Sequence, residues 1–130
     1  MMITITIPGD PTPKGRPRMT RTGHTYTPAR TRDYEARIRA AWTSEKLSGP
    51  LRAIITAYIR IPKSAKMAVR KNMLSGHEKP TKRPDLDNYI KSALDGLNGL
   101  AFDDDSQVIE IIARKAYGEE PRLVISLEGL

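Results

Sequence analysis

The chain has 130 residues, which is enough for one compact domain and too few for two. It has no cysteine, so disulfide bonds and cysteine-ligated metals are excluded, and no apolar run approaches the ~20 residues of a membrane-spanning helix. The net charge of +7 points to a polyanionic partner such as nucleic acid. Because the N-terminus also lacks the features of a signal peptide, we expect one cytoplasmic domain over residues 1–130, without membrane contact.

The charge is divided unevenly along the chain. Residues 1–83 carry 18 Lys and Arg against 5 Asp and Glu, whereas residues 84–130 carry 4 against 10. A basic first part and an acidic last part are typical of a phosphate-binding surface beside a cation-binding site. Acidic residues can also be solvated surface residues without a binding role. Their positions must therefore decide between a cation-binding site and an ordinary acidic surface.

The N-terminal segment predicts a strand followed by a small hairpin. Residues 2–7 alternate threonine with apolar side chains, which is the pattern of a half-buried strand, and Pro8 ends it. Residues 14–21 are too polar and too interrupted by Gly and Pro for a core element. Thr22 and Gly23 are typical of a hairpin tip.

A helix is predicted next, with Thr27 as its N-cap, Pro28 as its first residue and its end near Lys46. Its apolar side chains recur at helical spacing; they are Tyr34, Ile38, Ala41 and Trp42. Its arginines occupy much of the remaining surface, and we interpret them as a solvent-facing side; they are Arg30, Arg32, Arg37 and Arg39.

Residues 51–61 predict the strongest strand, with apolar side chains at every second position until Pro62. Ser64 is predicted to cap a short helix that runs through Leu74, with Gly76 just beyond its end. A further helix is expected from about Leu86 to Asn98.

Two strands, residues 107–117 and 122–127, flank a turn at residues 118–121 and predict a C-terminal hairpin. The order of these elements indicates an α+β domain in which helices pack on a small mixed sheet.

Two aspartates mark the start of the predicted helix over residues 86–98. Within a helix, residues two apart point in different directions, but at a helix entrance Asp85 and Asp87 can converge, and Pro84 favours such an entrance. A purely structural interpretation makes Asp85 the N-cap and Asp87 an acid that compensates the helix dipole. Lys91, four residues after Asp87, is then an ordinary helical ion-pair partner.

A metal-site interpretation explains more of the acids. A cap needs one carboxylate, yet two are present and three more follow at Asp103, Asp104 and Asp105. Mg²⁺ prefers oxygen ligands and is commonly held by a few carboxylates with water and substrate phosphate. A lysine beside such a cluster can neutralise charge that develops on a phosphoryl group.

The basic stretch near the N-terminus has little apolar content to bury. Lys14, Arg16, Arg18 and Arg21 are either a solvated loop or phosphate contacts. Given a polyanionic partner, we favour phosphate contacts.

The spacing of these residues resembles a known family. The segments that carry the resemblance are Asp85-Leu86-Asp87-Asn88, Lys91, residues 95–99 (Asp-Gly-Leu-Asn-Gly) and Asp104-Asp105-Ser106-Gln107-Val108. Together with residues 7–11, the basic stretch and residues 26–28, they resemble the RusA family of Holliday junction resolvases.

The resemblance implies a RusA-like fold and a homodimeric, Mg²⁺-dependent endonuclease that acts on branched DNA, the four-way junction, without a small-molecule cofactor. It assigns metal binding to Asp85, Asp87 and Asp105, with Asp104 as the alternative third ligand, and makes Lys91 the catalytic lysine. Lys82 and Arg83 become candidates for phosphate contacts. Two other functions stay open: a nuclease for flaps or forks, and a non-catalytic basic DNA-binding protein whose acids only cap a helix.

Overall fold

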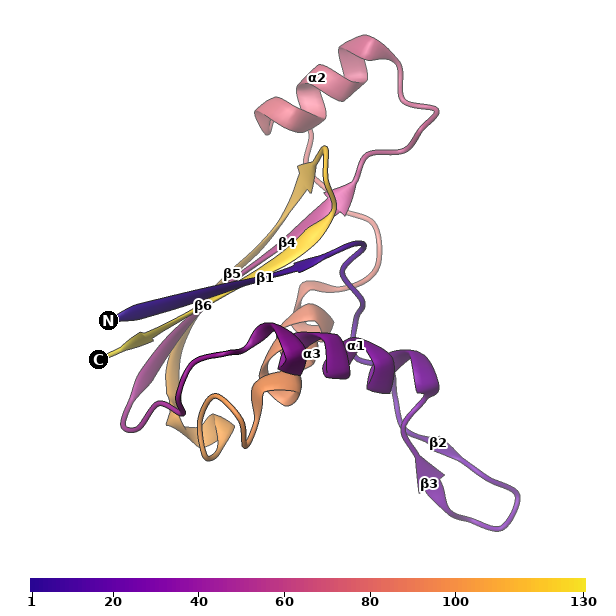
Figure 1. Ribbon diagram of the computed structural model, residues 1–130. Coiled ribbons are helices and arrows are strands. Elements are labelled where there is room, and N and C mark those ends of the chain that lie inside the picture. Colours follow the sequence, from indigo (N-terminus) through magenta and orange to yellow (C-terminus); the bar gives the residue numbers. More distant parts are fainter.

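The computed structural model describes residues 1–130 and contains two sheets and three α-helices (Figure 1). The main sheet has four strands, which are β1 (Met2–Pro8), β4 (Leu51–Arg60), β5 (Val108–Gly118) and β6 (Arg122–Gly129). The second sheet is the hairpin of β2 (Arg18–Met19) and β3 (Thr25–Tyr26). The helices are α1 (Ala29–Ala41), α2 (Met67–Ser75) and α3 (Leu86–Leu97), and a 3₁₀ turn, η1, spans Asp105–Gln107. The α+β prediction is confirmed.

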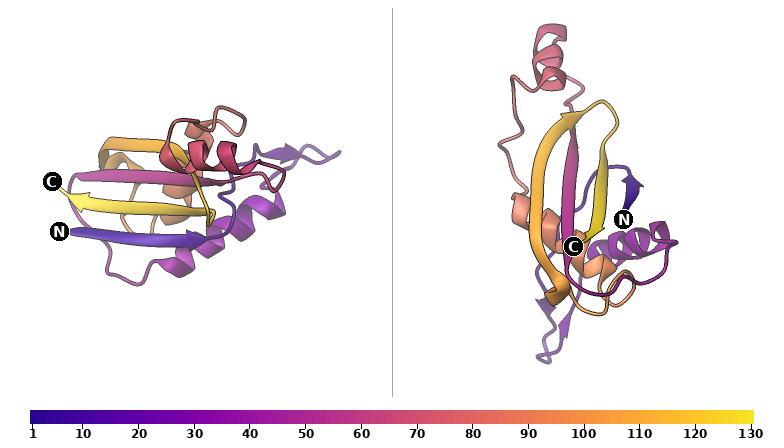
Figure 2. Two further views of the ribbon diagram at one scale, coloured as in Figure 1. Left: turned by 90° about the horizontal axis from the view of Figure 1, so that it is seen from above. Right: turned by 90° about the vertical axis from the view of Figure 1, so that its left-hand side faces the viewer.

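The strand order of the main sheet is β1-β6-β4-β5. Strand β6 runs antiparallel to β1 and β4, whereas β4 and β5 are parallel and are joined through α2 and α3. The predicted C-terminal hairpin is therefore wrong, because β4 lies between β5 and β6 (Figure 2). Parallel neighbours need a long crossover, and here the crossover carries the acids of interest into α3.

Three helix boundaries also differ from the sequence prediction. Helix α1 ends at Ala41, because Trp42 takes an extended conformation and is buried in the core. At its other end Pro28 is the N-cap residue, with no side-chain cap hydrogen bond. Helix α2 begins at Met67 after Lys66, so Ser64 does not cap it.

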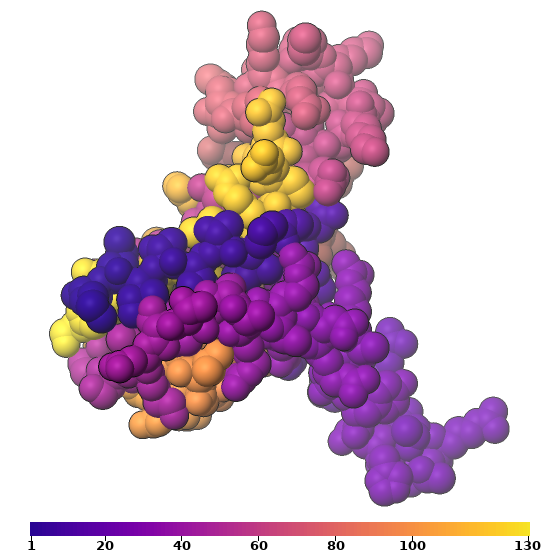
Figure 3. All heavy atoms as spheres, in the orientation of Figure 1, coloured from indigo at the N-terminus to yellow at the C-terminus, as the bar shows by residue number.

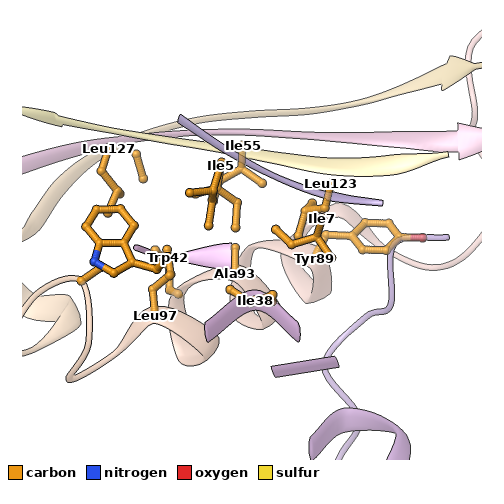
Figure 4. Packing of buried hydrophobic residues seen from close by; sticks show 14 of the residues in the cluster. Ile5, Ile7, Ile38, Trp42, Ile55, Tyr89, Ala93, Leu97, Leu123 and Leu127 are labelled. Carbon is orange, nitrogen blue, oxygen red and sulfur yellow. The ribbon is translucent and has the colours of Figure 1, made fainter. Parts of the chain in front are cut away.

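The core lies between one face of the main sheet and the pair α1 and α3 (Figure 4). Strand β4 shows why this face is buried: Leu51, Ala53, Ile55 and Ala57, at alternate positions, are fully inaccessible to solvent. Strands β1 and β6 add their own alternate residues, and the helices close the core from the opposite side with Tyr34, Ile38, Trp42, Tyr89, Ala93 and Leu97.

All four arginines of α1 are exposed, but two of them also make contacts within the protein. Arg37 donates a hydrogen bond to the Pro8 carbonyl, and Arg39 donates to the carbonyls of Gly96 (3.3 Å) and Asn98 (3.1 Å). These contacts fix α1 to the end of β1 and to α3. Arg30 and Arg32 have no partner within the chain and are exposed.

Helices α1 and α3 approach closely at Gly96. A Cβ placed there would lie 2.9–3.0 Å from atoms of the fully buried Ile38. We expect Gly96→Ala to lower the free energy of unfolding by about 1–3 kcal/mol, because overpacking forces neighbouring side chains out of place. Urea unfolding measures this loss.

The matched control for this substitution is Gly129→Ala, since a Cβ at Gly129 meets nothing within 4 Å. It should change the free energy of unfolding by less than about 0.5 kcal/mol. Equal stabilities for the two variants would show that the helices do not meet at Gly96.

Two elements project from the body formed by the sheet, α1 and α3 (Figures 1 and 3). One is α2, whose only buried residue is Met73. The other is the β2–β3 hairpin, whose residues are all exposed. None of the helices has the length and apolar character to cross a membrane.

Candidate active site

The entrance of α3 presents two carboxylates, and only one of them has the structural role that the sequence suggests. Asp85 occupies the N-cap position in an extended conformation, but its side chain makes no cap hydrogen bond. The first-turn amide of Asn88 instead donates to the backbone carbonyl of Asp85 at 3.1 Å. Asp87 lies in the first turn, and both aspartates are exposed. The Asp85 carboxylate therefore does not cap the helix, and the structural interpretation does not explain it.

These aspartates open into a cavity of about 380 Å³ whose lining contains no hydrophobic residue. Its walls come from the basic stretch and from one side of α3, and they are Lys14, Gly15, Arg16, Pro17, Asp85, Asp87, Asn88, Lys91 and Asp95. The spacing of Asp87, Lys91 and Asp95, each four residues after the last, places them along one helical face. The structure thus brings Asp85, Asp87 and Lys91 together in one cavity, which Arg16 also lines.

Lys14 is held by acids of the protein. Its ammonium lies 2.6 Å from the Glu35 carboxylate and 3.2 Å from that of Asp95. Burial alone would lower the pKa of Lys14, but the hydrogen bonds to Glu35 and Asp95 outweigh it and raise the pKa above its ordinary value. The charge of Lys14 therefore serves mainly to link the basic stretch to α1 and α3.

The remaining acids lie at the far end of α3. A helix of 12 residues is about 18 Å long, and Asp103, Asp104 and Asp105 follow its C-terminus. Within one chain no group of three His, Cys, Asp or Glu side chains lies close enough to hold a metal ion. Asp85 and Asp87 are thus separated from the predicted third ligand, whether this is Asp105 or Asp104.

Asp104 has a structural role at η1. Its carboxylate accepts a hydrogen bond from the amide of Ser106 at 3.2 Å, and Gln107 completes a capping box. The hydrogen bond from Ser106 holds the pKa of the Asp104 carboxyl below its ordinary value. Asp103 pairs with Lys46 at 3.0 Å. Asp105 has no hydrogen bond or ion pair from its side chain, so it is the better placed of the two candidates to accept a ligand.

The predicted phosphate contacts fall into two groups. Arg16, Arg18 and Arg21 lie exposed on or beside the β2–β3 hairpin. Lys82 and Arg83 lie exposed on the loop that leads into α3. Neither group has an ion-pair partner within the chain, so both present free positive charge to solvent.

Two residues at the site were missed by the sequence prediction. Asp95 follows from the four-residue spacing with Asp87 and Lys91, which was the signal for it. Lys115 gave only a weak signal: it is a charged residue on β5, in register with the buried Ala57 of β4. Its ammonium donates to the carbonyls of Lys82 (2.9 Å) and Pro84 (3.1 Å), which anchors the loop immediately before Asp85.

Comparison with known proteins gives one family and one relative. Residues 8–128 match the family described as Endodeoxyribonuclease RusA. A protein of Bacillus subtilis (strain 168), named only as uncharacterized protein YqaN, is 33% identical over 134 residues, which cover 96% of this chain and 94% of the relative. The family match includes the hairpin, the entrance of α3 and the acids at η1, and the chain therefore belongs to the RusA endodeoxyribonuclease family.

Proposed function

We propose that this single-domain protein is a Mg²⁺-dependent endodeoxyribonuclease that resolves four-way DNA junctions in the cytoplasm by paired hydrolysis of phosphodiester bonds. One observation carries the proposal. In a member of the RusA family, two exposed carboxylates, one of which has no structural role, share a cavity with a lysine and an arginine. Acids that hold a cation and bases that attract phosphate are the two requirements of metal-assisted phosphodiester hydrolysis.

The donor set at the entrance of α3 fits Mg²⁺. Hard cations take oxygen ligands, and Mg²⁺ is commonly bound by one or two carboxylates while water and substrate phosphate complete its coordination. Asp85 and Asp87 would hold it, and both are exposed to an incoming phosphate. When bound, the metal ion supplies an activated water and positive charge at the scissile phosphate.

The protein's own cations support the same reaction. Lys91 lies one helical turn beyond Asp87 and lines the same cavity, where its ammonium can stabilise negative charge on the phosphate that is attacked. Arg16 lines the same cavity and can orient the phosphate by charge-assisted hydrogen bonds. The expected products are nicks with a 5′-phosphate and a 3′-hydroxyl, which a ligase can seal.

A homodimer accounts for the distance between the two groups of acids. A four-way junction has near two-fold symmetry, so a dimer with two-fold symmetry presents two active sites to two strands. Asp105 directly precedes β5, an edge strand on which Ile109, Ile111 and Ile112 are exposed. A second copy that covers this apolar strand would bury it and would meet the Asp105 carboxylate at the same interface. Asp105 of one subunit then completes the site at Asp85 and Asp87 of the other.

The test is cleavage of an end-labelled four-way junction in Mg²⁺, with a fork and a linear duplex of the same sequence beside it. Paired, symmetric and ligatable nicks in the junction alone, lost in EDTA, are the expected result. Equal cutting of all three substrates would leave a nuclease without junction specificity. Tight binding of the junction with no cleavage in any divalent metal would reject the enzyme and leave a DNA-binding protein.

A further inference from the structure

A second cavity, of about 300 Å³, lies beside the one that holds the aspartates, and no hydrophobic residue lines it. Three arginines from two parts of the chain reach it: Arg16 and Arg18 from the basic stretch, and Arg30 from the first turn of α1. No Asp or Glu contributes to its walls. The cavity therefore combines space with positive charge that nothing in its walls neutralises.

The three guanidinium groups have no partner in the protein, and they are distinguished from other unpaired arginines, such as Arg32, by lining one cavity together. Arg39, Arg52 and Arg60, in contrast, donate to carbonyl or carboxylate oxygens of the protein. Like charges that converge without a counter-charge repel one another, and this repulsion is relieved when an anion binds between them.

The position of Arg30 adds to this cost. A cation in the first turn of a helix interacts unfavourably with the helix dipole, and the first turn of α1 has no acid to offset it. Helix stability therefore does not favour an arginine here, and an anion bound in the cavity would offset this cost for Arg30.

The two cavities are neighbours on one rigid wall. Gly15 and Arg16 line both of them. The stretch that carries these residues is fixed on two sides: the Gly15 amide donates to the Thr31 hydroxyl of α1 at 3.1 Å, and the Lys14 amide donates to the Asn88 carbonyl of α3 at 3.0 Å. A Cβ at Gly15 would lie 2.6 Å from that hydroxyl oxygen, so the stretch can pass this close to α1 only with glycine.

We propose that the cavity formed by Arg16, Arg18 and Arg30 binds a backbone phosphate of DNA adjacent to the phosphate that is cleaved. This inference rests on the proposed function and names a subsite of the same substrate. A strand whose scissile phosphate lies at Asp85 and Asp87 must continue along the shared wall of Arg16. Its neighbouring phosphate then enters the three-arginine cavity, which sets the register of the strand at the metal.

The first test compares Arg30→Gln with Arg32→Gln in binding a labelled four-way junction in EDTA, where no cleavage occurs. Arg32 is the matched control, because it is exposed on the same helix turn but does not line the cavity. We expect Arg30→Gln to weaken binding roughly tenfold and to lower the slope of log affinity against log salt by about one, as the loss of one phosphate contact requires. Arg32→Gln should stay within about twofold of the wild-type protein.

A second test locates the phosphate. Replacing single phosphates near the cut with neutral methylphosphonates should weaken wild-type binding at one of the two positions that flank the scissile phosphate. The same replacement should have no further effect on Arg30→Gln or Arg18→Gln, because the contact is already lost.

The two tests distinguish failure of the phosphate subsite from failure of the proposed function. Equal losses for Arg30→Gln and Arg32→Gln, or additive losses with every methylphosphonate, would overturn the subsite while leaving the nuclease intact. A wild-type protein that fails to bind any DNA would overturn the proposed function and the subsite with it.

Discussion

Asp87→Asn is expected to reduce junction cleavage roughly a thousandfold while junction binding is kept, because a neutral amide replaces the carboxylate that we propose as a metal ligand. The side chain is exposed and makes no contact that holds the fold, so the loss should be confined to the chemical step. Removing an acid from the first turn costs the helix only about 0.3–1 kcal/mol. Binding should be unchanged or slightly tighter, since one negative charge next to DNA is removed.

Single-turnover cleavage and binding in EDTA, measured on the same preparation, separate these two effects. Asp33→Asn is the control, because Asp33 is also an exposed aspartate in a helix but lies outside the site. It should cleave like the wild-type protein. Wild-type activity in Asp87→Asn would remove the aspartate pair from the reaction, and full activity in EDTA would remove the metal.

A heterodimer of Asp87→Asn and Asp105→Asn subunits is expected to recover cleavage that both parent proteins lack. If each site takes Asp87 from one subunit and Asp105 from the other, the heterodimer has one site with both carboxylates and one with neither. It should therefore nick one strand at roughly half the wild-type rate, without the paired second nick. Purification through two different tags isolates the mixed species.

The opposite arrangement gives an opposite result. If Asp87 and Asp105 of the same chain met in one site, every site of the heterodimer would lack one carboxylate, and cleavage would stay as low as in the parents. An active protein that sediments as a monomer on junction DNA would also reject the shared site. The separation of these residues by the length of α3 makes recovery the expected outcome.

The parts of the fold that the sequence predicted well are those with strong local periodicity. Strands β1 and β4 and helix α3 agree with the predicted ranges to within one residue, because alternation or helical spacing is continuous there. The end of α1 was wrong because burial of Trp42 outweighs the helical propensity of the polar residues that follow. The C-terminal hairpin was wrong because the pairing of β4 with both β5 and β6 is a long-range property, invisible in neighbouring residues.

At the candidate site, too, local geometry could be predicted from the sequence and long-range relations could not. Asp85, Asp87 and Lys91 are close in sequence, and local helix geometry alone brings them into one cavity. The relation of Asp105 to them depends on the whole length of α3 and, in the proposed homodimer, on a second subunit, and residue spacing reveals neither. Arg30 is exposed, but its place beside Arg16 and Arg18 could not be predicted, because only the fold brings the start of α1 next to the basic stretch.

The backbone of residues 12–15 is held between α1 and α3, so it loses its conformational entropy when the protein folds and not when DNA binds. Thr31 and Asn88 hold this stretch in the free protein, and the buried Ser92 hydroxyl donates to the Thr12 carbonyl at 2.7 Å. The conformational freedom of this stretch is thus given up on folding, so a DNA strand meets a surface that needs little rearrangement. Its anchors are also residues of the two helices that close the core. Local opening of the α1–α3 contact would therefore disperse the binding surface, and amide exchange at Lys14 and Gly15 should follow that of the core helices rather than that of a free loop.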